Sequence, residues 1–255
     1  MTSLKSVLRA LVGGRATPAP AAAPAQDGYK AAWNSAARAD AHDAILTGAT
    51  PERFEESGRG DAERVRRWLR GGDAVLNIGC GVGRVERYLA PLVGELWAID
   101  VSGEMLARAR KRLEGLPNVH LREVGNDEFL RSFEDERFDV VFSFLVLQHL
   151  EKEDAARYLR DAFRVLRPGG VFVGQFPNHL SPEYTRAFLE GLDLTARSPG
   201  RVRTYTEAEI RHTLETLGFA VEELRYGGDH GKSAEIYVAA RRPAGVTAGA
   251  PPRRG

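Results

Sequence analysis

The fold of this chain is decided by the stretch Val75-Leu76-Asn77-Ile78-Gly79-Cys80-Gly81-Val82-Gly83-Arg84. An apolar run leads into three glycines at alternate positions, and apolar residues at helical spacing follow, so the stretch predicts a strand, a tight turn and a helix. Glycines in such a turn let the backbone approach a ligand where a side chain would collide. The first N–H groups of the helix point toward whatever binds there. The stretch therefore predicts a ligand site; a tight turn that binds nothing is the alternative.

A second apolar run, Leu96-Trp97-Ala98-Ile99, ends in an acid, Asp100. In an open α/β sheet the end of the second strand lies beside the glycine turn that follows the first. A carboxylate at that place suits both hydroxyls of a ribose. A solvated loop acid is the alternative, but an acid that directly ends an apolar strand is better explained by ribose hydroxyls. The two segments together predict a nucleoside site.

The glycine spacing separates the kinds of nucleoside that the site holds. The dinucleotide fingerprint is G-x-G-x-x-G, whereas Gly79, Gly81 and Gly83 follow G-x-G-x-G, and Arg84 stands where the third glycine or alanine belongs. A phosphate-binding loop of the G-x-x-x-x-G-K-S/T type is absent. A nicotinamide-dependent oxidoreductase is therefore the least favoured of the functions considered.

The pattern resembles motif I of the class I S-adenosylmethionine (SAM) dependent methyltransferases. Further segments resemble that family in the same order along the chain, over roughly residues 60–240. These segments are Asp100 with Val101-Ser102 and Met105-Leu106, Val124-Gly125-Asn126-Asp127, Phe138 to Leu150, and Val165-Leu166-Arg167-Pro168-Gly169-Gly170.

The resemblance implies that SAM is the cofactor and that the glycine loop accommodates its amino-acid end. It also implies that the segment after the third strand faces the adenine and that the end of the fourth strand offers a backbone group. Core packing is the alternative for Met105, and an ordinary Asx turn is the alternative for Asn126 and Asp127. The predicted cofactor-binding residues are Asn77, Gly79, Cys80, Gly81, Gly83, Asp100, Val101, Met105, Asn126, Asp127 and Phe144.

One position departs from the family. Asn77 stands where the family usually has an acid that helps to hold the ammonium group of the cofactor. An asparagine still accepts a hydrogen bond but carries no charge. This departure keeps open a second hypothesis, a SAM-binding protein without transferase activity.

The rest of the chain alternates strands and helices, which predicts an α/β fold with right-handed crossovers. We expect a Rossmann-like sheet of seven mostly parallel strands with helices on both faces and an N-terminal helical extension; the resemblance implies that the last strand is antiparallel. Strands are predicted near residues 74–79, 95–100, 119–124, 138–144, 171–176, 220–224 and 234–240, and helices near 29–46, 83–90, 102–113, 153–166 and 206–218.

Composition divides the chain into four parts. Residues 1–28 are rich in Ala and Pro and predict a flexible arm, and residues 29–58 predict a helical cap segment. Residues 59–240 form the predicted methyltransferase domain, in which 177–205 is an insertion after the fifth strand. In the family such segments close over the site. Residues 241–255 predict a disordered tail.

Methyl transfer from SAM is an in-line substitution, so the protein must orient the acceptor, exclude water and sometimes remove a proton. His149 is the first candidate base because it follows the fourth strand at the carboxyl edge of the sheet and titrates near neutral pH. His179, after the fifth strand, is the second. For both, a histidine that only packs or hydrogen-bonds is the alternative.

The absence of nucleic-acid signatures guides the prediction of the methyl acceptor. The D/N-P-P-Y/F signature of amino-methylating nucleic-acid enzymes is absent from Ser143-Phe144-Leu145-Val146, and no cysteine follows the fourth strand. The formal charge of +1 also gives no sign of a nucleic-acid partner. What remains resembles the small-molecule and natural-product methyltransferases, so we expect a small-molecule O or N acceptor.

The remaining expectations concern metal, membrane and compartment. Cys80 is the only cysteine, and Asp40-Ala41-His42-Asp43 favours a solvated helix over a metal site. No apolar run is long enough to span a membrane. We therefore expect no metal, no membrane association and a cytoplasmic location. The oligomeric state is left open.

Overall fold

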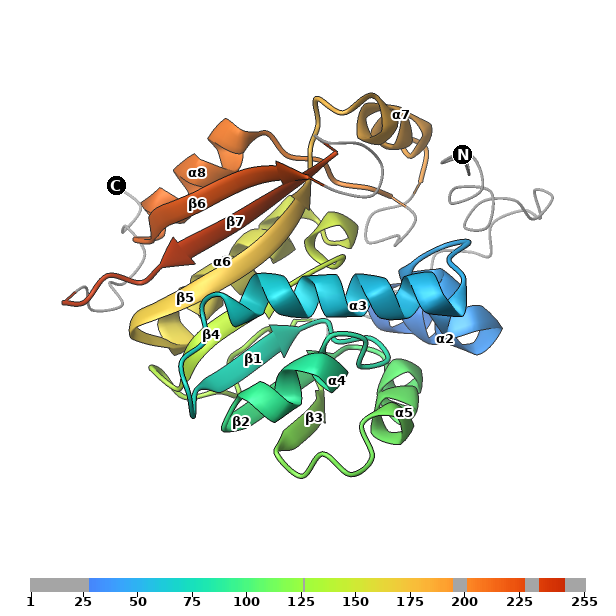
Figure 1. The fold of residues 1–255 in the computed structure, drawn as a ribbon. Coiled ribbons are helices and arrows are strands. Elements are labelled where there is room, and N and C mark those ends of the chain that lie inside the picture. The colour runs from blue at the N-terminus through green and yellow to red at the C-terminus, as the bar shows by residue number, and fades with distance from the viewer. Residues whose placement is uncertain (1–27, 126, 195–200, 228–233, 246–255) are drawn as a thin grey trace.

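The computed structural model describes residues 28–125, 127–194, 201–227 and 234–245. They contain a seven-stranded sheet in the order β3-β2-β1-β4-β5-β7-β6 (Figure 1). The strand β7 is antiparallel to both of its neighbours, and the other pairs are parallel. The predicted fold class is confirmed. The strands are β1 Ala74–Ile78, β2 Glu95–Asp100, β3 Val119–Glu123, β4 Phe138–Ser143, β5 Leu166–Pro177, β6 Ala220–Gly227 and β7 Glu235–Arg241.

The helices cover both faces of the sheet, and two of them precede it in the chain. Thr206 caps the start of α8, since its hydroxyl accepts a hydrogen bond from the Glu209 N–H at 3.2 Å. The helices are α2 Gly28–Ile45, α3 Pro51–Arg66, α4 Glu86–Leu89, α5 Gly103–Arg112, α6 Lys152–Val165, α7 Pro182–Glu190 and α8 Glu207–Thr216, with 3₁₀ turns η1 Ala90–Leu92 and η2 Leu147–His149.

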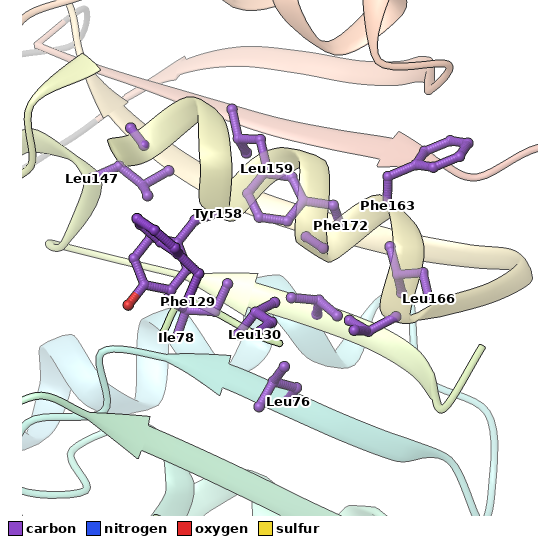
Figure 2. Close-up of a cluster of buried hydrophobic side chains, with 14 of the residues drawn as sticks. Leu76, Ile78, Phe129, Leu130, Leu147, Tyr158, Leu159, Phe163, Leu166 and Phe172 are labelled. Carbon is purple, nitrogen blue, oxygen red and sulfur yellow. The ribbon is translucent and has the colours of Figure 1, made fainter. Parts of the chain in front are cut away.

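The central strand β1 is buried on both faces because its side chains alternate between two cores. Leu76 and Ile78 lie in a cluster with side chains of α6 and α8, and Figure 2 shows Tyr158 and Leu159 of α6 in this cluster. Val75 lies in the opposite cluster with α3 and α4. Asn77 is therefore the polar exception in an apolar strand, on the same face as Val75.

Two predicted helices differ from those observed. The first is interrupted at Asp40 (φ −158°, ψ 109°), because the Asp40 carboxylate accepts hydrogen bonds from the N–H groups of His42 and Asp43 and so caps a new turn. The second, expected near 83–90, shrinks to α4. Gly83 has a φ of +81°, which prolongs the loop, and Pro91 follows in η1.

The ends of the chain also need correction. The predicted tail begins too early: Arg241 ends β7, and Arg242 is 1% exposed with its guanidinium donating to the Leu166 carbonyl at 2.6 Å. Residues 246–255 of that tail and residues 1–27 of the predicted arm lie outside the described residues. Gly28, assigned to the arm, begins α2.

Candidate functional site

A cavity lies at the carboxyl edge of the sheet, where β1, β2 and β4 end. Its walls come from α2, from the loop after β1, from the start of α5, from the segment after β4 and from α6. Nine of the predicted site residues line it: Asn77, Gly79, Cys80, Gly81, Asp100, Val101, Met105, Phe144 and His149. The structure thus brings most of the predicted site together.

Two of the three motif glycines allow side chains of the cavity wall to pack directly against the loop. A Cβ on Gly79 would lie 2.3 Å from Val146, and one on Gly81 would lie 2.8 Å from Ile45. Both glycines have positive φ, +78° and +54°. Gly83 does not line the cavity. A Cβ there would lie 2.8 Å from Leu113, so the glycine permits close packing against that side chain. Gly79 and Gly81 shape the cavity, and Gly83 permits packing after α5.

Asp100 presents a partly buried carboxylate to the cavity. Its Oδ2 accepts a hydrogen bond from the Gly81 N–H at 2.8 Å, and its Oδ1 accepts one from the Ser102 N–H at 2.8 Å. Burial raises the pKa of Asp100 to about 6, although these two hydrogen bonds act against the rise. Each carboxylate oxygen keeps a second lone pair for a ligand. Backbone N–H groups thus hold the carboxylate in place beside the glycine loop.

Asn77 is joined to a residue that the motif comparison did not single out. Asn77 is 4% exposed, and its Nδ2 donates to a carboxylate oxygen of the fully buried Glu86 on α4. The Oδ1 of Asn77 and the Oε2 of Glu86 have no partner. No sequence motif singles out Glu86, whose burial on α4 is visible only in the structure.

The backbone after β4 adopts an unusual conformation beside the glycine loop. Leu145 has a φ of +60°, in the left-handed region that non-glycine residues seldom occupy, and its N–H donates to Oε1 of Gln175 at 2.7 Å. Phe144, Leu145 and Val146 all line the cavity. Strained backbone of this kind is often found at functional sites.

The two candidate histidines are in different places. His149 lines the cavity, and its ring lies edge-on to Trp33 with a centroid distance of 5.0 Å and an interplanar angle of 78°. His179 does not line the cavity, because its Nδ1 contacts Oγ1 of Thr204 at 2.7 Å and its ring packs against Phe188. The geometry keeps His149 as a candidate base and moves His179 away from the site.

The predicted adenine contacts also differ from the cavity lining. Asn126 lies outside the described residues, and Asp127 is exposed and does not line the cavity. Val124, which directly follows β3, lines it instead. The described side chain after β3 that faces the cavity is therefore apolar.

Residues from α2 and α6 complete the cavity, and most were not singled out by sequence as site residues. Tyr29 and Trp33 come from α2, and Asp154 and Tyr158 come from one face of α6. The Tyr29 hydroxyl donates to Oδ2 of Asp154 at 3.2 Å and accepts from the Glu151 N–H at 2.8 Å. Burial raises the pKa of both Tyr29 and Tyr158, so both phenols stay protonated near neutral pH.

Arg84 anchors the glycine loop to α3. Its guanidinium is 4% exposed, with Nη2 2.6 Å from Oδ2 of Asp61 and Nη1 2.8 Å from Oγ of Ser57. The residue that departs from the dinucleotide fingerprint thus forms a buried ion pair.

Comparison with known proteins gives three kinds of match. The methyltransferase-domain family matches residues 75–170. A Mycolicibacterium smegmatis protein named "Probable S-adenosylmethionine-dependent methyltransferase" is 36% identical over 152 residues, which are 60% of this chain and 54% of that protein. Demethylmenaquinone methyltransferase of Tropheryma whipplei is 29% identical over 60% of this chain and 65% of its own length.

A solved structure shows the same fold. Magnesium protoporphyrin IX methyltransferase of Synechocystis, with bound SAH, superimposes with a TM-score of 0.64 at 20% identity and covers 84% of this chain and 97% of its own. The chain spans 54% of the length of the first relative and 65% of the length of the second.

The described residues contain neither a membrane-spanning helix nor a cluster of metal ligands. None of their helices combines the length and the apolar character that crossing a membrane requires. Within the same residues, no three His, Cys, Asp or Glu side chains gather as ligands for a metal ion.

Proposed function

We propose that this chain, which belongs to the class I SAM-dependent methyltransferases, binds SAM in the cavity at the sheet edge and transfers its methyl group to a small-molecule O or N acceptor. The observation that carries the proposal is the Asp100 carboxylate fixed by the Gly81 N–H, because it puts an acid for ribose directly against the glycine loop.

The residues of the cavity fit SAM in three respects. Asp100 has lone pairs left for two ribose hydroxyls. Gly79 and Gly81 let the cavity-lining side chains of Val146 and Ile45 lie directly against the loop, where any Cβ would collide with them. Val101 and Val124 offer apolar surface of the kind that an adenine ring packs against, and the unpartnered Oδ1 of Asn77 accepts a donor from the amino-acid end.

The protein contributes position and shielding to the reaction. SAM, when bound, supplies a methyl group on a positively charged sulfur, and the thioether that leaves is neutral. Asp100 and the glycine loop orient the cofactor end of the cavity, and Trp33 and Tyr29 of α2 cover it against water. His149, in contact with Trp33, is placed to take the proton of a hydroxyl or protonated amine.

A small molecule is the proposed acceptor for two reasons. The segment after β4 lacks the nucleic-acid signature and forms the strained turn at Leu145 instead. The relative from Tropheryma whipplei is named for demethylmenaquinone, a small molecule. A protein that binds SAM without transferring its methyl group remains the competing function.

Calorimetric titration with SAM and, separately, with NAD⁺ tests the proposal, after any ligand that copurifies has been removed. Saturable SAM binding without NAD⁺ binding supports it. A folded protein that does not bind SAM contradicts the proposal. Transfer of labelled methyl from SAM to a panel of hydroxyl- and amine-bearing metabolites then separates an enzyme from a silent binder.

The affinity for SAM is expected to fall in acid. Because ribose hydroxyls donate to the ionised carboxylate, and burial raises the pKa of Asp100 to about 6, only a minority of the molecules are ready to bind at pH 5. We expect the Kd to be about tenfold weaker at pH 5 than at pH 7.5. The same shift makes this carboxyl favour the ligand-free folded state below pH 4 and lose that contribution as pH rises through 6.

Calorimetry at the two pH values measures the effect, with Asp100→Asn as the control. The variant has no carboxyl to titrate, so its weaker affinity should change little with pH. An equal fall in both proteins would assign the dependence to another group, such as His149.

Replacing His149 with alanine is expected to slow methyl transfer by about a hundredfold while leaving the Kd for SAM nearly unchanged. The reason is that His149 lines the cavity and packs against Trp33, and in the proposed reaction it takes the proton of the acceptor. His179→Ala is the matched control, because His179 lies outside the cavity lining. Single-turnover rates decide: equal slowing in both variants would remove His149 from the proposed chemistry.

A further inference from the structure

One residue of the cavity lining has a buried side-chain oxygen without a hydrogen-bond partner. Asn77 is 4% exposed and lines the cavity, and its Oδ1 is unpartnered. Among the described residues, other buried side-chain atoms lack partners, but only those of Asn77 belong to a residue of the cavity lining. A buried acceptor is unfavourable unless a ligand or water supplies a donor. A ligand that binds beside Asn77 is therefore expected to offer a hydrogen-bond donor to its Oδ1.

Glu86 determines which end of the Asn77 amide is left for a ligand. The Nδ2 of Asn77 donates to Oε1 of Glu86, and an ionised carboxylate only accepts hydrogen bonds. The amide oxygen is consequently the end that remains. Glu86 is fully buried on α4 and does not itself line the cavity, so it acts on the cavity through Asn77.

Glu86 also brings an ionisable carboxyl group close to the cavity. Burial raises its pKa, while the hydrogen bond from Asn77, backbone N–H groups and the nearby Arg84 guanidinium act in the opposite direction. A cation that arrives at Asn77 would favour the ionised form further. Charge on Glu86 and a cation at Asn77 therefore stabilise each other.

We propose that Glu86 is a positioning residue that supplies, through Asn77, the negative charge that receives the ammonium group of SAM. The inference rests on the proposed function, since it concerns the amino-acid end of the same cofactor. Sequence alone suggests that the charge is lost at position 77. The structure places an acid one hydrogen bond behind it.

Two ligands separate this role from a purely structural one. S-adenosylhomocysteine carries both an ammonium and a carboxylate group, whereas 5′-methylthioadenosine keeps the adenosine and thioether but lacks both. Removal of a negative charge helps a nearby carboxylate and harms a nearby ammonium. A loss of affinity confined to S-adenosylhomocysteine therefore identifies the ammonium.

The experiment measures the Kd of both ligands by calorimetry for the wild type and Glu86→Gln. Glutamine has the shape of glutamate and can still accept from Asn77, so folding should be retained, which thermal unfolding checks. We expect S-adenosylhomocysteine to bind about tenfold more weakly, because a charge-assisted interaction is replaced by a neutral one. The Kd of 5′-methylthioadenosine should stay within about twofold.

A relocated charge gives the second readout. Asn77→Asp with Glu86→Gln moves the carboxylate to position 77 and the amide to position 86, and we expect it to recover the affinity for S-adenosylhomocysteine. Asn77→Asp alone sets two buried carboxyl groups side by side and should lower the unfolding temperature. Recovery in the double variant with instability in the single one supports the charge partnership.

The outcomes keep the two proposals apart. If the wild type binds neither ligand, the proposed function fails. If it binds both and Glu86→Gln leaves S-adenosylhomocysteine unchanged or tighter, or weakens both ligands equally, the role of Glu86 is wrong while SAM binding stands.

Discussion

Asp100→Ala is expected to weaken SAM binding by at least about a hundredfold, because two hydrogen bonds from ribose hydroxyls to an ionised carboxylate are lost together. The loss is larger than for a surface acid since Asp100 is held by the N–H groups of Gly81 and Ser102 inside the protein. Removing the carboxylate also leaves those two donors without their partner. The variant therefore loses both the ligand contact and the group that fixes the glycine loop.

Calorimetric titration with SAM measures this loss, and two controls interpret it. Asp127→Ala removes an exposed acid outside the cavity lining and should bind like the wild type. Asp100→Asn keeps the shape and one acceptor and should fall between the two. An affinity of Asp100→Ala within about threefold of the wild type would show that the ribose is held elsewhere.

Arg84→Ala is expected to lower the free energy of unfolding by about 3–5 kcal/mol, because breaking a buried ion pair leaves an uncompensated charge. Arg84 and Asp61 are 4% and 8% exposed, and their closest nitrogen and oxygen atoms are 2.6 Å apart. Arg64 lies 3.5 Å from the other oxygen of Asp61 and offsets part of the loss, so the lower end of the range is expected.

Urea unfolding measures this change, and α3 offers a matched control. Arg66 forms an exposed pair with Glu63, so Arg66→Ala should cost less than about 1 kcal/mol. Arg84→Met combined with Asp61→Leu removes both charges and should cost less than Arg84→Ala alone. Equal, small losses for Arg84→Ala and Arg66→Ala would mean that the buried pair contributes no more than a surface one.

The pair also explains how the extension is joined to the sheet. A Cβ on Gly58 of α3 would lie 2.5 Å from the Arg84 carbonyl oxygen, so helix and loop touch at a glycine. Loss of Arg84 should therefore loosen the loop that carries Gly79 and Gly81, and the SAM affinity should fall together with stability.

The sheet and its ligand edge were predictable because their signals are local. Apolar runs of strand length, separated by glycine turns and helical stripes, predict parallel strands whose carboxyl ends share one edge. Gly79, Gly81 and Asp100 lie directly at the ends of β1 and β2, so the strand assignment alone places them together. Their role as cofactor ligands stays a prediction that the Asp100 variants test.

The two histidines show that local sequence patterns do not predict which side chain faces the cavity. His149 and His179 both follow a strand at the same sheet edge, and the sequence gives them similar standing. Packing separates them: one ring meets Trp33 at the cavity and the other meets Phe188 and Thr204. Which side chain faces a cavity depends on the elements packed above the strand ends, and those elements come from elsewhere in the chain.

By itself the sequence determined the α/β fold and predicted the ligand edge of the sheet, since both follow from residue patterns within about ten neighbours of a strand. Only the tertiary structure decided the partners across distance: Tyr29 with Asp154, Arg84 with Asp61, and Asn77 with Glu86. Periodicity shows which face of an element is buried but not which polar groups meet there. Those groups pair because burial without a partner is costly, and only the packed layers bring the partners together.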